Sequence, residues 1–358
     1  MLGITEATRR FKATGVVLLL IAAAGWDPGL NAQMVPGDAA IAKQFSRAFA
    51  GDISVQRQLG LALEHGHAGV QQNIPQAAYW LGKAAGLGDP FAQTELGTMY
   101  LEGSGVPKDA TKAAEWFQRA ALSNYGIAEH DLGALYYQGR GVTRDVDEAI
   151  RWFRKAAERG LPQSELNLGI LALSGFGGDD HEAIHWLQKA AHHHYANAWF
   201  ALGYAYEKGR GVPQDFSKAA KLYMQAADEN VAAAHTDLGL LFETGQGVPL
   251  DLGRAKQHFL RAAELGDPFA YVSLARVGLA GVSGESEFAE IYFWLRAAEM
   301  SLTPNSPLVL AVQAHARATG LKLSNEARLA AEQRANEWVG AHPATAVNSP
   351  LSVDIARY

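Results

Sequence analysis

The sequence contains no cysteine, which excludes disulfide bonds, cysteine-ligated zinc and thiol nucleophiles. It also lacks a run of basic residues, and its net charge is -6 with a pI near 6.1. A protein that holds nucleic acid through phosphate contacts needs a basic surface, so we expect no nucleic-acid partner. Three catalytic signatures are missing as well: a phosphate-binding glycine loop after a strand, a Gly-x-Ser-x-Gly elbow, and a serine followed three residues later by lysine.

The long apolar run of a membrane-spanning helix is also missing. A positively charged stretch, residues 9–12, precedes a mostly apolar and uncharged segment, residues 13–25, which is shorter than the roughly 18–20 residues that span a bilayer. This order, with small residues after it, is typical of a secretory signal peptide. We therefore expect a signal peptide over residues 1–32, cleaved after Ala32 or else after Ala24. The mature chain would have no membrane span and would be periplasmic or secreted; an uncleaved anchor is the alternative.

A Leu-Gly pair recurs along the chain at intervals of 34 to 37 residues. Its copies are Leu59-Gly60, Leu96-Gly97, Leu132-Gly133, Leu168-Gly169, Leu202-Gly203 and Leu238-Gly239, and Leu274-Ala275 continues the series. Most copies have a small residue four positions before the leucine and an aromatic or aliphatic residue three positions after the glycine. This spacing predicts one amphipathic helix per copy, in which the glycine lets a neighbouring helix approach closely.

Most copies continue with a Gly-x-Gly-Val loop and a second apolar-periodic segment that ends in Ala-Ala. The first glycine of the loop suits the left-handed residue that ends a helix. The residues placed to cap the second helix are Asp109, Asp145, Asp215 and Asp251. The second segments carry tryptophan at one shared position: Trp80, Trp116, Trp152 and Trp186. We interpret this series as repeat core, because stacked helix pairs bury an apolar stripe that one pair cannot bury alone.

These repeats resemble the Sel1-like repeat family, relatives of the tetratricopeptide repeats, over residues 54–301. The resemblance implies an all-α fold, a right-handed superhelical solenoid of helix-turn-helix repeats. We expect seven repeats, of which the fourth is two residues short and the seventh departs from the pattern. The flanks predict an N-terminal capping helix within 33–53, C-terminal capping helices within 302–340 and a flexible tail over 341–358.

The fourth repeat contains His181-Glu182-x-x-His185, which matches the signature of zinc proteases. In the other copies these positions hold residues of both charge signs, which indicates a solvent-facing surface, and no third ligand stands at the spacing that a zinc protease requires. A weaker hypothesis concerns His181, His185 and His192, which lie near one helix face and suit a divalent metal or a pH-responsive patch. A solvated, histidine-rich turn is the plainer interpretation, and we expect no resident cofactor.

A polar residue usually precedes the leucine of each first helix, and stacked helices would align these residues in a row. Aromatic residues interrupt the row in the fifth repeat. The candidate partner-binding residues are Glu95, Asp131, Asn167, Trp199, Tyr204 and Asp237. Because the resemblance implies that first helices line a concave face, we expect a protein or peptide partner there. The alternative is that the row merely faces solvent and that some of the aromatic residues are core.

The chain is therefore predicted to be a non-enzymatic, secreted or periplasmic scaffold for protein or peptide partners. The resemblance implies roles in envelope assembly, cell-surface signalling, exopolysaccharide control or host interaction, without choosing among them. One alternative is a metal-dependent hydrolase, or a metal- or pH-sensing protein, that uses the cluster His181–His194. Another is a polysaccharide-binding protein, which would need exposed aromatic side chains in the fifth repeat.

Overall fold

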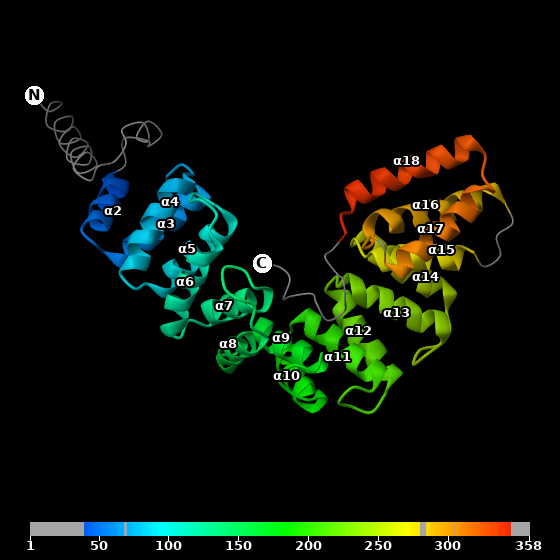
Figure 1. Cartoon of the computed structure of the whole chain (residues 1–358), viewed down its shortest axis with the longest axis horizontal. Helices are drawn as coiled ribbons and strands as arrows, with labels where there is room; N and C mark the ends of the chain where they lie inside the picture. The colour runs from blue at the N-terminus through cyan, green and yellow to red at the C-terminus, as the bar shows by residue number, and fades with distance from the viewer. Residues whose placement is uncertain (1–38, 68–69, 280–283, 305, 345–358) are drawn as a thin grey trace, which may run out of the picture. The chain divides into compact units, whose positions relative to one another are not determined.

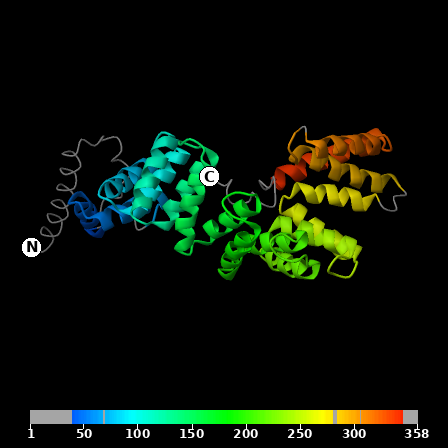
Figure 2. The same ribbon diagram turned by 60° about the horizontal axis from the view of Figure 1, so that its bottom comes forward.

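The computed structural model describes residues 39–67, 70–279, 284–304 and 306–344. The predicted signal peptide and most of the predicted tail lie outside these residues. The described residues form helices α2 to α18 and no strand (Figures 1 and 2). The fold class is therefore the predicted one, an all-α array of helix-turn-helix repeats of the solenoid type. Among the described residues, no helix has the length and apolar character that crossing a membrane requires.

Two helices form each repeat, which we call helix A and helix B. The A helices are α3 (Ile53–His65), α5 (Pro90–Glu102), α7 (Gly126–Gln138), α9 (Pro162–Leu173), α11 (Ala196–Lys208), α13 (Ala232–Thr244) and α15 (Pro268–Gly278). The B helices are α4 (Ile74–Gly86), α6 (Ala110–Leu122), α8 (Val146–Glu158), α10 (Asp180–His192), α12 (Phe216–Asp228), α14 (Leu252–Glu264) and α16 (Glu285–Ser301). Helix α2 (Ala39–Phe49) precedes the array, and α17 (Pro307–Gly320) and α18 (Asn325–Ala341) follow it.

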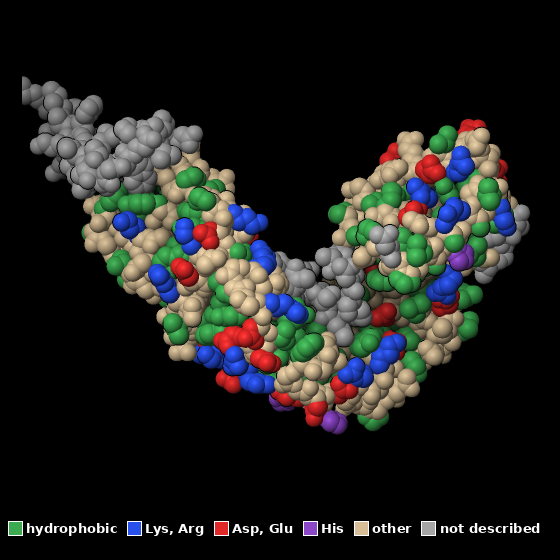
Figure 3. Space-filling model, viewed as in Figure 1, with side chains coloured by type: hydrophobic (Ala, Val, Ile, Leu, Met, Phe, Trp, Pro, Cys, Tyr) green, Lys and Arg blue, Asp and Glu red, His purple; other side chains and the backbone are tan. Residues whose placement is uncertain are grey.

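The helices belong to two compact units, which are described separately. The N-terminal unit, residues 1–159, contains α2 to α8, and the C-terminal unit, residues 160–358, contains α9 to α18. Basic and acidic side chains are interspersed on the face of each unit that Figure 3 presents. A mixed face of this kind fits the mildly acidic composition of the chain.

In the first six repeats, helix A packs on its own helix B through the glycine of the Leu-Gly pair. A Cβ atom on Gly97 would lie 2.6 Å from the ring of Phe117, and one on Gly203 would lie 2.6 Å from the ring of Tyr223. The same contact recurs in the pairs Gly60 with Leu81, Gly133 with Phe153, Gly169 with Leu187 and Gly239 with Phe259. The close approach predicted from the sequence is confirmed, and its partner is one large side chain at a fixed position of helix B.

A second contact joins successive repeats and involves the other glycine of the Gly-x-Gly loop. In the third repeat Gly139 and Gly141 both have φ of 70°, a left-handed conformation that favours glycine. Gly139 ends α7, and its N–H donates to the carbonyl oxygen of Leu135 at 2.8 Å. A Cβ on Gly141 would overlap the backbone carbonyl of Ala110, in the first turn of the preceding B helix. Equivalent contacts are Gly105 with Ile74, Gly211 with Asp180 and Gly247 with Phe216.

The predicted helix caps and tryptophan core are confirmed. The capping carboxylates accept from the backbone N–H three residues later at 2.9 to 3.0 Å; they belong to Asp109, Asp145, Asp215 and Asp251. Trp80 is 1% exposed because Phe45 and Phe49 of α2 pack against it edge to face. Trp152 and Trp186 are also buried, and Trp116 is partly buried beneath the Arg119 guanidinium.

Helices α17 and α18 pack on α16 where the sequence predicts a closing helical pair (Figures 1 and 2). Aromatic residues fill this contact, since Trp338 of α18 lies edge to face against Phe293 and Trp294 of α16 at centroid distances of 6.0 and 5.3 Å. Ser324 caps α18 by accepting from the N–H of Ala327 at 3.2 Å, as predicted. The end of the array is therefore covered by helices that have their own apolar contacts.

The glycine–ring contact predicts opposite effects for two alanine substitutions within helices of one unit. Gly97→Ala should lower the free energy of unfolding by about 1–3 kcal/mol, because the new methyl group overpacks the Phe117 ring. Gly82→Ala should raise it by about 0.5–1 kcal/mol, because alanine favours the helix and the nearest atom to the new Cβ, on Leu96, is 3.9 Å away. Urea unfolding followed by circular dichroism measures both. Effects of the same sign would contradict the assigned contact.

Candidate binding site

Carboxylates from three successive A helices gather in the N-terminal unit. This acidic cluster consists of Glu64 of α3, Glu95 and Glu102 of α5, and Asp131 of α7. Asp131 is 7% exposed, and its Oδ1 has no hydrogen-bond partner in the part of the chain that the structure describes. Oε2 of Glu64 is likewise buried and unpartnered there. Because a buried acceptor without a donor is costly, the cluster offers hydrogen-bonding capacity that the described residues leave unused.

Burial and mutual repulsion raise the pKa values of carboxylates in the acidic cluster. Burial, and after it the charge of Glu95, raises the pKa of Asp131 to about 7. Burial also raises the pKa of Glu95; Glu64 and Glu102 add to this effect, and His65 opposes it. Near neutral pH both protonation states of Asp131 are therefore populated. A cation bound at the cluster would favour the charged forms, so the arrangement suits a lysine, arginine or amino-terminal group.

The C-terminal unit has a different polar cluster, formed by Glu207 and Lys208 of α11, Tyr223 of α12 and Asp237 of α13. The Tyr223 hydroxyl donates to Oε2 of Glu207 at 2.8 Å, and Lys208 forms an ion pair with Glu207. Burial, followed by the charges of Glu207 and Asp267, raises the pKa of Asp237 to about 8. Asp237 is therefore mostly a neutral acid at pH 7. It can donate a hydrogen bond but contributes little charge to the row predicted from the sequence.

The aromatic residues of the fifth repeat divide between core and surface. Phe200 is 1% exposed and belongs to the core. Trp199 is partly buried against that core, and the His194 ring meets it edge to face at 5.9 Å. Tyr204 is partly exposed, with the Lys208 ammonium 5.7 Å from its ring centroid. The exposed part of the predicted patch is therefore reduced to Trp199 and Tyr204.

Asn167 is the most deeply buried of the candidate partner-binding residues. Its side chain has no exposed surface, and neither Oδ1 nor Nδ2 has a hydrogen-bond partner among the described residues. Asp131 is also more buried than a row facing solvent would be. Hydropathy alone did not indicate this, because a polar residue within an A helix usually reads as exposed.

Three acidic residues of these clusters, Glu64, Glu102 and Glu207, were not among the candidate partner-binding residues. Glu64 and Glu207 both stand five residues after the leucine of their A helices, and Glu243 occupies the same position in the sixth repeat. Glu243 forms an ion pair with Arg276 on the next A helix. The repeat register therefore contains a second acidic position, close to the end of helix A, that could have been found from the sequence.

The histidine-rich helix of the fourth repeat presents its histidines to solvent. His181, His185 and His192 are exposed on α10. Glu182, the expected catalytic residue of a zinc protease, accepts from Nε1 of Trp186 at 3.3 Å. Within the described ranges, no three His, Asp or Glu side chains are placed to hold a metal ion. The metal hypothesis therefore gains no support from the geometry.

The fold defines a helical repeat protein. The Sel1 repeat family model matches residues 53–89, 90–125, 126–161, 162–195, 196–231 and 232–267. These matches cover more than half of the chain, so the chain belongs to the Sel1 repeat family. The pair α15 and α16, expected as a seventh repeat, lies beyond the six matches. Sel1 repeats typically mediate contacts between proteins, and scaffolds built from them are generally non-enzymatic.

Solved structures provide a further comparison. A Sel1 repeat protein from Oxalobacter formigenes shares 28% identity at a TM-score of 0.63, over 70% of this chain and 99% of that one. A protective antigen of uropathogenic Escherichia coli strains that displays the SLR fold shares 22% identity at a TM-score of 0.41, over 94% and 85% of the two chains. An immunity protein from Pseudomonas aeruginosa shares 19% identity at a TM-score of 0.36, over 59% of this chain and 74% of that one. No match to a curated protein reaches significance.

The raised pKa of Asp237 predicts a pH-dependent stability difference. An aspartate in the unfolded chain has a pKa of about 3.9, so between pH 4 and pH 8 the folded protein holds a proton that the unfolded chain releases. Stability should therefore fall as pH rises through this range, and Asp237→Asn, which cannot ionise, should escape the part of the loss that Asp237 causes. Urea unfolding at pH 5 and pH 8 should show the variant gaining on the wild type. Exposed Glu229→Gln should give no such gain; equal behaviour of the two variants would contradict the assignment.

Proposed function

We propose that this protein is a non-enzymatic scaffold that binds a protein or peptide partner through its A helices, and that the acidic cluster receives a positively charged group of that partner. The observation that carries the proposal is the buried Asp131 carboxylate near Glu95, whose Oδ1 has no donor among the described residues. Membership of the Sel1 repeat family supports the general role, because such repeats typically mediate contacts between proteins.

The electrostatics of the cluster support a cationic ligand. Hydrogen bonds to charged groups contribute roughly 1.5–3 kcal/mol each, and they are stronger where water is excluded. A lysine or arginine side chain would supply the missing donor to Asp131 and offset its repulsion with Glu95. Because Asp131 has to lose its proton for the full interaction, partner binding should release protons near pH 7 and should tighten between pH 6 and pH 8.

Within the C-terminal unit, Trp199, Tyr204 and Asp237 suit a different part of a partner. Aromatic residues are frequent anchors in protein interfaces, and a neutral carboxylic acid can donate to a carbonyl oxygen. This surface therefore favours uncharged peptide segments over a cation. No observation among the described residues favours a metal-dependent hydrolase, so the scaffold is the only function proposed.

Affinity capture from the host cells tests the scaffold and the cluster together. The double variant Glu95→Gln/Asp131→Asn should bind the captured partner about tenfold or more weakly than the wild type, because the paired charges are gone. The wild-type complex should also release protons, seen in calorimetry as a dependence of the binding heat on the ionisation enthalpy of the buffer.

The matched control is Glu115→Gln/Asp147→Asn, which replaces one glutamate and one aspartate at exposed positions on B helices of the same unit. It should bind as the wild type does. An equal loss of affinity in both double variants would show that the effect comes from net charge alone, and it would overturn the proposed site. Failure to recover any partner under several growth conditions would count against the scaffold itself.

We also propose that the chain is exported from the cytoplasm. The support is the charged and apolar pattern of residues 1–25, followed by small residues. Mass spectrometry of the protein from fractionated cells should find a mature chain that begins at Gln33, outside the cytoplasm. An intact amino terminus in the membrane fraction would instead identify an uncleaved anchor, and a full-length chain in the cytoplasm would overturn export.

A further inference from the structure

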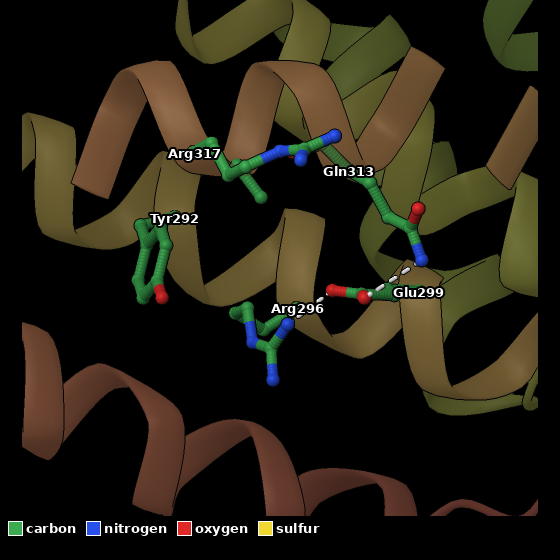
Figure 4. A pocket seen from close by; sticks show the side chains of 6 residues that line it. Tyr292, Arg296, Glu299, Gln313 and Arg317 are labelled. Carbon is green, nitrogen blue, oxygen red and sulfur yellow. Dashed lines mark hydrogen bonds and ion pairs between the residues drawn. The ribbon is translucent and has the colours of Figure 1, made fainter. Parts of the chain in front are cut away.

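A pocket lies between α16 and α17 near the end of the C-terminal unit. Its volume is about 310 Å³, and the side chains around it include Tyr292, Arg296, Glu299, Gln313 and Arg317 (Figure 4). Arg296 and Glu299 come from α16, whereas Gln313 and Arg317 come from α17. Polar groups of two helices therefore converge on one space, which we call the C-terminal pocket.

The arginines of the C-terminal pocket keep donors that the surrounding residues do not use. Arg296 forms an ion pair with Glu299 through Nη1, but its Nε is buried and has no acceptor among the described residues. Arg317 donates from Nε to the backbone carbonyl of Gln313 in its own helix at 3.3 Å. Its terminal nitrogens have no partner within the described residues. Two guanidinium groups on different helices are thus left with free N–H groups.

The carboxylate at the pocket is already engaged. One oxygen of Glu299 accepts from Arg296, and the other accepts from Nε2 of Gln313 at 3.1 Å, as the dashed lines of Figure 4 show. The Tyr292 hydroxyl donates to Glu332 of α18 at 2.7 Å. Both oxygens of Glu299, the carboxylate that lines the pocket, therefore already have donors other than Arg317.

The charge balance at the pocket is positive. The charges of Arg296 and of Arg328 in α18 oppose the rise that burial and Glu332 produce in the pKa of Tyr292. The charged residues that line the pocket are Arg296, Arg317 and Glu299. Two cations thus face one carboxylate, which leaves one positive charge for a ligand to neutralise.

We propose that the C-terminal pocket binds an oxyanion, a carboxylate or phosphate group, with Arg296 and Arg317 as its donors. The planar guanidinium presents paired N–H groups that match the two oxygens of a carboxylate or two oxygens of a phosphate. Such a ligand would supply the acceptors that both arginines lack. The C-terminal pocket favours an anion, whereas the acidic cluster favours a cation. A test of the pocket is therefore independent of a test of the proposed function.

Thermal unfolding of the whole protein tests the site with two simple probes. Inorganic phosphate and succinate are titrated against sodium chloride at equal ionic strength, because a ligand that binds only the folded state raises the melting temperature in a saturable way. We expect at least one probe to do so. A response to phosphate alone identifies a phosphate site, and a response to succinate alone identifies a carboxylate site.

Arg317→Gln is the decisive variant, because its exposed side chain bonds only to its own helix and its removal should leave the fold intact. The variant should bind the responding probe at least tenfold more weakly than the wild type does. Arg334→Gln is the matched control: this α18 residue pairs with Glu290, outside the C-terminal pocket, and should respond as the wild type does. No saturable response to either probe, or an undiminished response in Arg317→Gln, would overturn the proposal.

Discussion

The contact between a glycine in helix A and a large side chain in helix B is the constraint on which the repeats depend. Gly97 against Phe117 and Gly203 against Tyr223 place a ring directly on a helix backbone, so the spacing between the helices is set by the absence of a side chain. A methyl group at these positions would overlap the ring, because a close-packed interior has no free space for it. The cost of a glycine within a helix, about 1 kcal/mol relative to alanine, is offset by the burial of that ring.

The sequence predicts the parts of this fold that repeat, because six copies in register reveal what one copy would not. The close approach at the Leu-Gly pair, the Asp109-type caps and the tryptophan core could all be found in this way. The role of Gly141 could not, because it depends on the backbone of Ala110 in the preceding repeat. The protonation of Asp131 was equally hidden, because it depends on Glu95 and on burial that hydropathy does not report.

The candidate surfaces show how one register position acquires different chemistry in different repeats. Asp131 and Asp237 both precede the leucine of an A helix. Asp131 lies beside unpaired carboxylates and suits a cation, whereas Asp237 lies among Glu207, Lys208 and Tyr223 and mostly keeps its proton at pH 7. Neighbouring helices, rather than the residue itself, decide whether the position carries charge. A row of identical side chains is therefore a poor guide to a row of identical binding groups.

The two glycine contacts differ in whether their two residues belong to the same repeat or to successive repeats. The large side chain that meets the Leu-Gly pair belongs to the same repeat, whereas in four repeats the second glycine of the loop meets the first turn of helix B in the repeat before it. A repeat with both contacts therefore carries the internal contact complete and shares the other with its neighbour. Recombination that removes or duplicates one whole period, of 34 to 37 residues, would re-form both kinds of contact at the new junction between such repeats. Arrays of this kind can therefore change length by unequal crossing-over without passing through an ill-fitting intermediate.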